Sequence, residues 1–403
     1  MFIEGVKAKL IKNSRKEKTI EVEIKTLKGK FFASAPSGKS IGKNETPMYN
    51  EKGIGHSLKM LNVFARKLKN QNFMIRNFED IYVLETGIKK FENRYGIFGA
   101  NATYALETAF LKAAACENHK ELWKFICDSF GEKPKIPRPV GNCIAGGKHS
   151  HIDKKPDFQE FLLIPNEKSF SRDVTKMIRT YEHAKTLLKK KEKKWILKRT
   201  DEGAWQTSLT SEEVLEILKE LGWKAKMQIG IDVASSSFFS NGYYNYKNKE
   251  LTRDKQEQID YMQHLIKKYK LFYVEDPIQE EDFTGFLGLR KEVVKGNVLI
   301  VGDDLISTDL KRLIRAIRNK VINAVIVKPN QKGYMGEVAK VVGLCKKNNI
   351  KMIFSHRSGE TMDNALADYA VGFGADFIKC GIHGKERLVK LARVMKIEKS
   401  LKT

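Results

Sequence analysis

Charged and polar residues end a series of short apolar runs in the second half of this 403-residue chain. They are Asp232 after "IGI", Glu275 and Asp276 after "YV", Asp303 and Asp304 after "IVG", Lys328 after "IV", His356 after "IFS" and Lys379 after "FI". One acidic residue after a strand is more often a helix cap or a loop residue. A succession of them indicates one shared site, because burying many carboxylates together is costly unless cations neutralise them.

Three of these acids form a set of oxygen ligands. Asp232, Glu275 and Asp303 suit Mg²⁺, with water and substrate completing an octahedron. Lys328 and Lys379 follow later apolar runs, and a lysine near other cations has a lowered pKa and can act as a base. The alternative is that each lysine pairs with a carboxylate. A lysine base beside a divalent metal favours proton abstraction next to a carboxylate.

Strands that converge on one edge must position these residues. Strand candidates are "FLLIP", "WILKRTD", "IGIDVA", "FYVED", "VLIVGDD", "AVIVKPN", "KMIFSH" and "DFIKC". Amphipathic helices are expected at 170–188, 211–221, 254–269, 308–318, 334–348 and 384–396. This alternation predicts a (β/α)8 barrel, whose strand ends meet at one mouth, together with Glu160 of "DFQEF" and Glu202 of "KRTDEG". A doubly wound open sheet is the alternative, but no GxGxxG motif follows a strand.

The first 130 residues differ from the rest and predict a small α+β domain. "TIEVEIKTL" alternates as a half-buried strand does, and "GKFFASAPSG" is its expected hairpin partner. Helical periodicity follows at 58–68 and 81–88, and "NATYALETAFLKAAACE" is rich in helix formers, with Asn101 as the expected cap. We therefore expect an α/β protein in which residues 1–130 form the small domain and residues 136–403 form the barrel.

The composition bounds the possible partners. A surplus of 74 basic over 49 acidic residues gives a net charge of +25, but the lysines are spread along the chain and no nucleic-acid-binding motif accompanies them. We expect a lysine-rich surface that attracts anionic substrates, with nucleic acid disfavoured as the primary partner. No apolar run is long enough to cross a membrane, and the N-terminus has no signal-peptide core. Five scattered cysteines indicate reduced thiols and a cytoplasmic protein.

One long motif carries a resemblance to a known family. "FSHRSGET" at 354–361 closely resembles the SHRSGET motif of enolases, and further family motifs occur in the family's order: "PSGKSIGKNE", "GANA", "IGIDVASSSFF", "VEDP", "VGDDL", "KPNQKG" and "FIKCG". The sequence is identified as a divergent, archaeal-like member. The resemblance implies a small α+β domain followed by a (β/α)8 barrel that starts ββαα. It also implies a Mg²⁺-dependent glycolytic lyase, phosphopyruvate hydratase, acting on 2-phosphoglycerate and phosphoenolpyruvate, and a homodimer or higher homo-oligomer.

The resemblance implies a role for each matching metal ligand. Asp232, Glu275 and Asp303 match the residues that hold the first of two Mg²⁺ ions. Ser40, in the "PSGKS" loop, matches the serine that joins the second ion when substrate is bound. This loop is expected to be mobile and to exclude water when it closes.

The same resemblance implies the catalytic residues. Lys328 matches the base that removes the C2 proton, and Glu202, with Glu160 beside it, matches the acid that helps the C3 hydroxyl leave. Lys379 matches the lysine that contacts the substrate carboxylate. The other substrate contacts implied in this way are His149, Gln159, Glu160, His356, Arg357 and Ser358.

Several loops depart from the family pattern. "TDEGAW" replaces GDEGG, so Ala204 and Trp205 add bulk near Glu202 and could reshape the pocket. The loop from Lys148 to Asp157 is longer than usual, so that His151 could replace His149, and "CGIHG" places His383 near the rim. Two further functions therefore stay open: an enolase-like enzyme for another phosphorylated or carboxylated hydroxy acid, and a basic protein of this fold that binds RNA or a cell surface.

Overall fold

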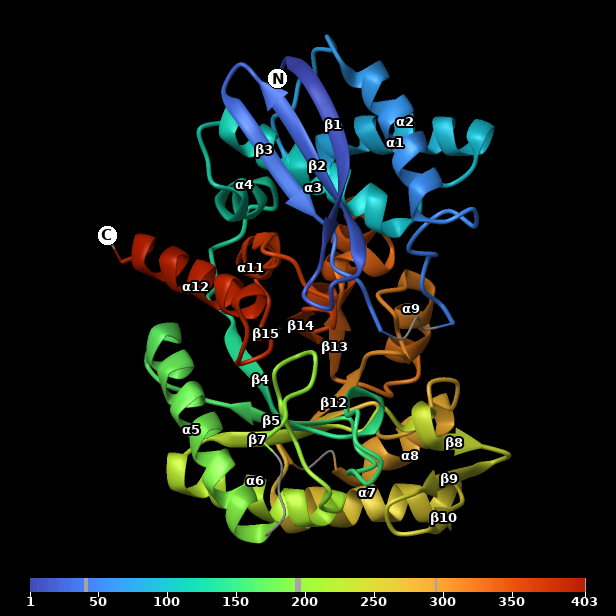
Figure 1. Cartoon of the computed structure of the whole chain (residues 1–403), viewed down its shortest axis with the longest axis vertical. Coiled ribbons are helices and arrows are strands. Elements are labelled where there is room, and N and C mark those ends of the chain that lie inside the picture. Colours follow the sequence, from blue (N-terminus) through green and yellow to red (C-terminus); the bar gives the residue numbers. More distant parts are fainter. Residues whose placement is uncertain (40–42, 193–196, 294–295, 403) are drawn as a thin grey trace.

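The computed structural model describes residues 1–39, 43–192, 197–293 and 296–402. The chain forms two packed parts along the long axis of the molecule (Figure 1). A small sheet with helices, coloured blue to cyan, lies at one end, and a strand barrel surrounded by helices makes up the rest. This is the α/β architecture predicted from the sequence.

An antiparallel sheet and four helices make up the N-terminal part. In sheet order, the strands are β1 (Ile3–Lys12), β2 (Lys18–Thr26) and β3 (Gly29–Ser34). The helices are α1 (Ile54–Leu68), α2 (Ile81–Tyr95), α3 (Ala100–Glu117) and α4 (Leu122–Ser129). The predicted hairpin is confirmed as β2 and β3. β1 was not predicted from the sequence, because Ile3 and Ala8 are its two buried residues and lie five positions apart, so that the strand shows no regular alternation.

The cap predicted for α3 is wrong. The helix begins at Ala100, after Gly99 with a φ of 93°. A Cβ atom at position 99 would lie 2.4 Å from Tyr49 Cα, so the backbone approach requires glycine. Asn101 instead donates to the Tyr49 hydroxyl (3.1 Å) and accepts from Asn330 Nδ2 (2.9 Å). Its side chain therefore joins the N-terminal part to the barrel.

Eight strands close into the barrel. They are β4 (Arg138–Ala145), β5 (Glu160–Ile164), β7 (Gln228–Asp232), β11 (Tyr273–Glu275), β12 (Leu299–Gly302), β13 (Ala324–Val327), β14 (Lys351–Ser355) and β15 (Phe377–Lys379). β15 pairs with β4 and completes the ring. β5 runs antiparallel to both of its neighbours, β4 and β7, while the other pairs are parallel. Two strands precede two helices at the start of the barrel, which confirms the predicted ββαα order.

The candidate strand "WILKRTD" at 195–201 is not part of the barrel. Residues 195 and 196 lie outside the described part of the chain, and the remainder contributes an isolated bridge from Arg199 to Trp205. The eighth strand is β4, whose sequence "RPVGNCIA" was not recognised because proline and glycine interrupt its apolar run. The short strand β6 (Trp205–Gln206) pairs with the end of β4 and is a side branch of the sheet.

Within the described residues, eight helices follow the barrel strands. They cover the outside of the barrel (Figure 1). They are α5 (Phe170–Lys191), α6 (Ser211–Ala225), α7 (Lys255–Tyr269), α8 (Phe283–Val293), α9 (Leu310–Arg318), α10 (Met335–Lys347), α11 (Ala365–Gly372) and α12 (Lys385–Ser400). The six expected helices are confirmed. The sequence analysis missed α8, which contains two glycines, and α11, which is buried on all sides and so lacks an amphipathic period. A small sheet of β8 (Phe239–Ser240), β9 (Tyr243–Tyr246) and β10 (Leu251–Arg253) projects beside α7.

Apolar side chains fill the barrel interior below its mouth. This cluster comprises Val140, Leu162, Ile164, Tyr273, Leu299, Val301, Ala324, Ile326, Ile353 and Phe377. Alternate residues of each strand face inward, and their packing excludes water from the barrel axis. The polar residues that end the strands thus lie above a dry floor and share one mouth.

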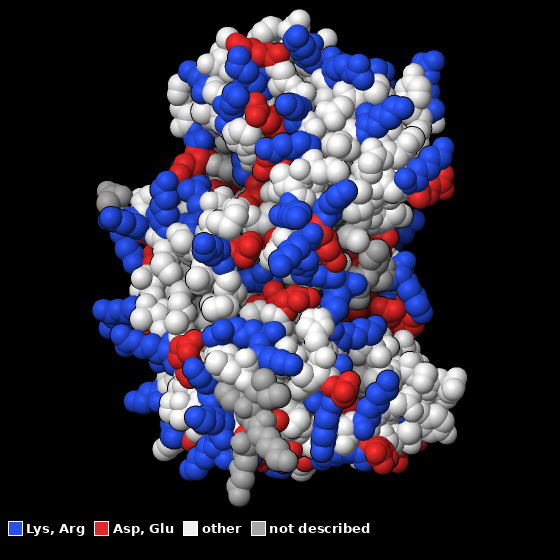
Figure 2. Space-filling model, viewed as in Figure 1, with Lys and Arg blue, Asp and Glu red and all other residues white. Residues whose placement is uncertain are grey.

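The surface is basic over a wide area. Figure 2 shows Lys and Arg side chains spread over the visible face, with Asp and Glu side chains between them, as expected for a solvated lysine-rich surface. Within the described ranges, no helix combines the length and apolar character needed to cross a bilayer.

Candidate active site at the barrel mouth

A cavity of about 320 Å³ opens at the mouth of the barrel. Of the residues singled out from the sequence, it is lined by His149, Gln159, Glu160, Glu202, Asp232, Asp303, Lys328, His356, Arg357, Ser358 and Lys379. Glu275 does not line it, because its side chain is fully buried, but it contacts Lys379, which does. Ser40 lies outside the described residues. Residues far apart in the chain therefore meet around one space.

Strand register places the acids side by side. Glu160 of β5 is opposite Asp232 of β7, and Asp232 is opposite Glu275 of β11. Glu160 was expected at the end of a strand, but it is the first residue of β5. It reaches the mouth because β5 runs antiparallel to β7. Asp303 directly follows β12 and so reaches the same edge.

The ammonium group of Lys379 lies among these acids. Its Nζ is 2.8 Å from Glu160 Oε2, 3.1 Å from Asp232 Oδ2 and 2.8 Å from Glu275 Oε2. Burial opposes the charge, but attraction to Asp232 and the other two carboxylates raises the pKa of Lys379 well above its ordinary value. Lys379 is therefore a fixed positive charge in the wall of the cavity.

Lys328 forms a second ion pair at the mouth. Its Nζ lies 2.5 Å from Asp303 Oδ2. Burial lowers the pKa of Lys328, but attraction to Asp303 and Asp304 exceeds both burial and the repulsion from Arg357, so the pKa is raised. The lowered pKa expected from the sequence is not found for the protein by itself, because the neighbouring carboxylates dominate over the neighbouring cation.

The three acids predicted to bind metal have the properties of cation ligands. Burial, and then repulsion from Asp232, raises the pKa of Glu275 well above its ordinary value, and burial likewise raises the pKa of Asp232. Burial opposes the charge of Asp303 too, but Lys328 lowers its pKa. Asp303 Oδ1 is buried without a hydrogen-bond partner in the described part of the chain. A divalent cation would neutralise these carboxylates and engage the free oxygen.

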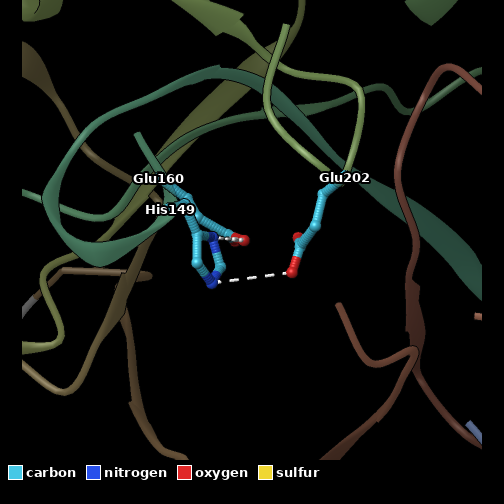
Figure 3. A group of neighbouring side chains, drawn as sticks. All are labelled: His149, Glu160 and Glu202. Atoms are coloured by element: carbon cyan, nitrogen blue, oxygen red, sulfur yellow. Dashed lines mark ion pairs between the residues drawn. The ribbon is translucent and has the colours of Figure 1, made fainter. Parts of the chain in front are cut away.

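His149 connects two acids across another part of the cavity (Figure 3). It lies on the short 3-10 helix η2 (Gly147–His149), with Nδ1 3.3 Å from Glu160 Oε1 and Nε2 3.5 Å from Glu202 Oε1. His356 Nε2 approaches the other oxygen of Glu202 at 3.4 Å. Burial opposes the charge of Glu202, but His149 and His356 lower its pKa well below the ordinary value. One ligand atom from each of His149, Glu160 and Glu202 could also contribute to a metal site, because the three atoms lie close to one another.

The structure places His149, and not His151, in the cavity. His151 is half-exposed and pairs with Asp201, its Nε2 lying 3.3 Å from Asp201 Oδ1. Gln159 also lines the cavity and donates from Nε2 to Asp232 Oδ2 at 3.3 Å. The histidine loop thus delivers one histidine to the acids and leaves the other at the surface.

Arg357 is held by an acid from the N-terminal part. Its Nη2 donates to Glu45 Oε2 at 2.9 Å and to Oε1 at 3.2 Å, and both side chains are buried. Nη1 donates to Asn330 Oδ1 at 3.4 Å. Ser358 Oγ accepts from Arg15 Nη1 at 3.2 Å. The guanidinium group is therefore oriented before any ligand arrives.

The structure adds cavity residues that the sequence analysis did not single out. They are Gly38, Lys39, Lys43, Glu45, Lys148, Ala234, Ser236, Ser237, Phe239, Gln279, Glu280 and Ser355. Most lie in loops, where no periodicity marks them; the "PSGKSIGKNE" motif was the available signal for Lys39, Lys43 and Glu45. Asp304, which was named with Asp303 from the sequence, also lines the cavity. Asp276 plays a supporting part, because it accepts from the backbone N–H groups of Asp303 (3.0 Å) and Asp304 (2.7 Å).

Ala204 and Trp205 do not line the cavity. Both are fully buried behind the turn that carries Glu202. That turn joins residues 197–200 to β6. The sequence had predicted the end of a barrel strand at this place, and that prediction is wrong. The side chains of Ala204 and Trp205 therefore pack behind the turn that carries Glu202 and do not change the shape of the cavity.

The fold and the mouth define a class of protein. A closed (β/α)8 barrel that presents clustered carboxylates, a buried lysine, a partly buried lysine and a histidine-bound glutamate at its mouth has the architecture of a barrel enzyme. Comparison with known proteins narrows this class. Residues 3–126 match the family described as "Enolase, N-terminal domain", and residues 133–403 match "Enolase, C-terminal TIM barrel domain".

Full-length relatives agree with this assignment. The enolase of Methanosphaera stadtmanae is 36% identical over 99% of this chain and 97% of its own length. That of Methanocorpusculum labreanum is 35% identical over 98% of each chain, and that of Thermoplasma acidophilum is 33% identical over 99% of this chain and 98% of its own. The chain belongs to the enolase family and is an enzyme of the lyase class. These archaeal relatives confirm the archaeal-like character expected from the sequence.

Proposed function

We propose that this protein is a Mg²⁺-dependent enolase that interconverts 2-phosphoglycerate and phosphoenolpyruvate in glycolysis and gluconeogenesis. The observation that carries the proposal is the meeting of Lys328, Glu202 and the acid cluster around one cavity of about 320 Å³. This combination supplies a base, an acid and ligands for a divalent cation.

Asp232, Glu275 and Asp303 would hold the first Mg²⁺, since they provide convergent hard oxygens, and the raised pKa values of Glu275 and Asp232 indicate that their charges call for a further cation. A second Mg²⁺ would join with the substrate through Ser40, on the basis of the motif. When bound, Mg²⁺ would supply positive charge that stabilises the negative charge developing on the substrate carboxylate, and Asp303, as one of its ligands, would be less available to pair with Lys328. The unpartnered Asp303 Oδ1 supports this assignment.

Lys328 is the proposed base. As a neutral amine, its Nζ takes the proton from C2 of 2-phosphoglycerate and becomes an ammonium ion. That proton is weakly acidic, because its loss adds negative charge beside a carboxylate. Lys379 offsets this charge, since its ammonium group is fixed in the wall of the same cavity. The raised pKa of Lys328 indicates that Asp303 must be engaged elsewhere before the amine can be neutral.

Glu202, with Glu160 beside it, is the proposed acid for loss of the C3 hydroxyl as water. Burial opposes its charge, but attraction to His149 and His356 lowers its pKa well below the ordinary value, so Glu202 by itself holds a proton weakly. His149 Nε2, 3.5 Å from Glu202 Oε1, is placed to return that proton, and attraction to Glu202 raises the pKa of His149 against the effect of burial. Glu202 thus gives its proton to the departing hydroxyl, and His149 supplies the next proton to Glu202.

Arg357 and Ser358 are the proposed phosphate contacts, with His356 and Gln159 completing the substrate site. The planar fork of a guanidinium group matches two phosphate oxygens. Because Arg357 pairs with Glu45 in the protein alone, phosphate binding exchanges one anion for another at a group that is already oriented. Lys39, Lys43 and Lys148 add positive charge to the cavity lining, which favours an anionic substrate.

The remaining parts of the proposal follow from the family. We infer a small domain of residues 1–130, a catalytic barrel of residues 136–403, a homodimer or higher homo-oligomer, and a cytoplasmic location. Size-exclusion chromatography with light scattering measures the oligomeric state directly.

The test is turnover of 2-phosphoglycerate by the purified protein with Mg²⁺, followed through the ultraviolet absorbance of the enol phosphate. We expect a rate that is lost with EDTA, restored by excess Mg²⁺ and lost in Lys328→Ala. No rate with 2-phosphoglycerate, together with turnover of another hydroxy acid, would establish an enolase-like enzyme of different specificity. Salt-sensitive RNA affinity without any turnover would establish a binding protein of this fold.

A further inference from the structure

Glu202 lies at the tip of a tight hairpin between α5 and α6. Gln206 N donates to Lys198 O at 3.0 Å, Thr200 N donates to Ala204 O at 2.9 Å, and Gly203 N donates to Thr200 O at 2.9 Å. One arm of the hairpin is attached to the barrel, because β6 (Trp205–Gln206) pairs with the end of β4, but Glu202 itself lies in the turn before β6 and belongs to no strand. Further contacts hold this turn against the cavity.

A buried tyrosine of α5 holds the hairpin from behind. The Tyr181 hydroxyl donates to Gly203 O at 2.6 Å, which is the carbonyl directly after Glu202. Arg199 Nε donates to the same hydroxyl at 2.7 Å, and the Trp205 indole N–H donates to Tyr181 O at 3.0 Å. Tyr181 and Trp205 are almost fully buried, so these bonds are sheltered from water.

Ring stacking reinforces these hydrogen bonds. The rings of Tyr181 and Trp205 are stacked, with centroids 5.0 Å apart and an interplanar angle of 12°. The Arg199 guanidinium lies 4.0 Å from the centroid of the Trp205 ring, and His383 stacks on Tyr181 at 6.4 Å. Arg199 lies on one arm of the hairpin and Trp205 on the other, and both contact Tyr181, which lies in α5.

The segment after β15 closes the hairpin from a second direction. A Cβ atom on Gly381 would lie 2.6 Å from Glu202 O, and one on Gly203 would lie 2.7 Å from His383 O. Gly203 also has a φ of 85°, which a residue with a side chain rarely adopts. The backbone of Glu202 and Gly203 therefore lies in contact with the "CGIHG" segment and has little room to move.

We propose that Tyr181, with Arg199 and Trp205, is the positioning device for the acid Glu202. None of the three lines the cavity. They act through the hairpin backbone, which sets the distances from Glu202 to His149 and His356. The departures "TDEGAW" and "CGIHG" meet at this device, so they serve to hold the acid and do not shape the substrate pocket. This inference rests on the proposed function, because it assigns a step that Glu202 is proposed to perform.

Tyr181→Phe tests the device with minimal change in volume. The variant keeps the ring stack and loses the hydroxyl that joins Gly203 O to Arg199. Tyr269→Phe is the matched control, since Tyr269 is buried in α7 and its hydroxyl donates to Glu216 at 2.9 Å, away from the cavity. Arg199→Gln is the second variant: its half-buried side chain can be changed without opening the core, in case Tyr181→Phe does not fold.

Two rates separate positioning from general damage. Exchange of the C2 proton of 2-phosphoglycerate in D2O, followed by NMR, needs the base, whereas formation of phosphoenolpyruvate also needs the acid. We expect Tyr181→Phe and Arg199→Gln to lower dehydration about tenfold, with C2 exchange and KM within about twofold of wild type. Tyr269→Phe should leave both rates unchanged. An unchanged dehydration rate, or an equal fall in both rates, overturns the proposal.

Crystals of Tyr181→Phe supply a readout that does not depend on turnover. We expect the Glu202 carboxylate to move away from His356 while Asp232, Lys328 and Lys379 stay in place. If wild type converts no 2-phosphoglycerate but Glu202 moves in Tyr181→Phe, the proposed function fails and the positioning role stands. If wild type is active and Glu202 does not move, the positioning role fails and the proposed function stands.

Discussion

Two clusters of buried acids lie in this protein, one at the barrel mouth and one where the N-terminal part meets the barrel. At the second cluster, Glu107 of α3 accepts from Met335 N at 2.7 Å, and Glu85 of α2 accepts from Gly336 N at 2.8 Å. These are the first N–H groups of α10, which has no side-chain cap from its own sequence. Two helices of the N-terminal part thus cap a helix of the barrel.

The pKa shifts alone do not distinguish the two clusters. Burial, then repulsion from Glu85, raises the pKa of Glu107 well above its ordinary value, as burial and Asp232 do for Glu275. The surroundings differ. The acids at the mouth contact Lys328 and Lys379 beside a cavity, whereas Glu85 and Glu107 contact a helix end within packed helices. An acid with a perturbed pKa becomes a candidate catalytic or ligand-binding residue when it lies at a cavity that a ligand can enter and beside a cation that compensates its charge.

The same contrast explains the division of labour between the two regions. The interface acids satisfy donors that have no other partner, so they stabilise one arrangement of the two parts. Both clusters contain carboxylate oxygens without a hydrogen-bond partner within the described residues: Asp303 Oδ1 at the mouth, and Glu85 Oε2 and Glu107 Oε1 at the interface. The mouth acids lie at a cavity, so a cation and a substrate can reach them and offset the cost of their burial on binding. The predictions below test this division.

Removing the base gives the largest expected effect. Lys328→Ala should lower turnover of 2-phosphoglycerate by about 10³-fold or more, because no other amine is proposed to take the C2 proton. Lys112→Ala is the matched control: Lys112 pairs with Asp363 at 2.7 Å outside the cavity, between α3 and the barrel. It should keep turnover and lose some stability. Equal activity losses in both variants would remove the distinction between mouth and interface.

Removing the acid gives the next largest effect. Glu202→Gln keeps the shape of the side chain and cannot donate a carboxyl proton, so dehydration should fall about 10²-fold. C2 exchange should persist, because Lys328 is untouched. Glu107→Gln, a buried glutamate changed in the same way at the interface, should leave both rates as in wild type. The assignment of Glu202 fails if its variant dehydrates at the wild-type rate.

Truncating the interface acid should affect folding and not catalysis. Glu107→Ala leaves Met335 N without its acceptor and opens space beside α10, so the free energy of unfolding should fall by about 2 kcal/mol. Urea denaturation measures this change, and kcat of the folded variant should match wild type. A large loss of kcat without a loss of stability would show that the interface takes part in the chemistry.

The smallest expected effect is a pH dependence of stability. Because the pKa of Glu107 is raised in the folded state, ionisation costs stability as the pH rises above about 4.5, the ordinary value. Its charged neighbours are Glu85 and Glu337, which add to the rise, and Lys89, which opposes it. The Tm of Glu107→Gln should therefore improve relative to wild type as the pH is raised from about 5 through the neutral range. A constant Tm difference over this range would contradict the raised pKa.

Much of the mouth could be predicted from sequence because its residues follow strands. Asp232, Glu275, Lys328 and Lys379 end buried runs, and a closed barrel brings such ends together whatever their separation in the chain. His149 and Arg357 lie in loops, where no physical pattern marks them, and they were found through family motifs. Spacing and motif thus supplied different parts of the same site.

What was missed depends on tertiary contacts. β4 carries proline and glycine, and α11 is apolar on every side, so neither shows the period of its element. Glu85 and Glu107 look like ordinary polar residues of helices, and only the packing of α10 against α2 and α3 buries them. The position of the Glu202 side chain likewise depends on tertiary contacts, since the Tyr181 hydroxyl of α5 donates to the carbonyl of Gly203, the next residue.

Exchange of the C2 proton of 2-phosphoglycerate in D2O is the most direct test of the account, because it reports the base and the metal ligands before any water leaves. With Mg²⁺, wild type and Glu202→Gln should exchange the proton, while Lys328→Ala, Asp303→Asn and wild type with EDTA should not. Exchange by Lys328→Ala at the wild-type rate would contradict the claim that the barrel mouth is built around this lysine.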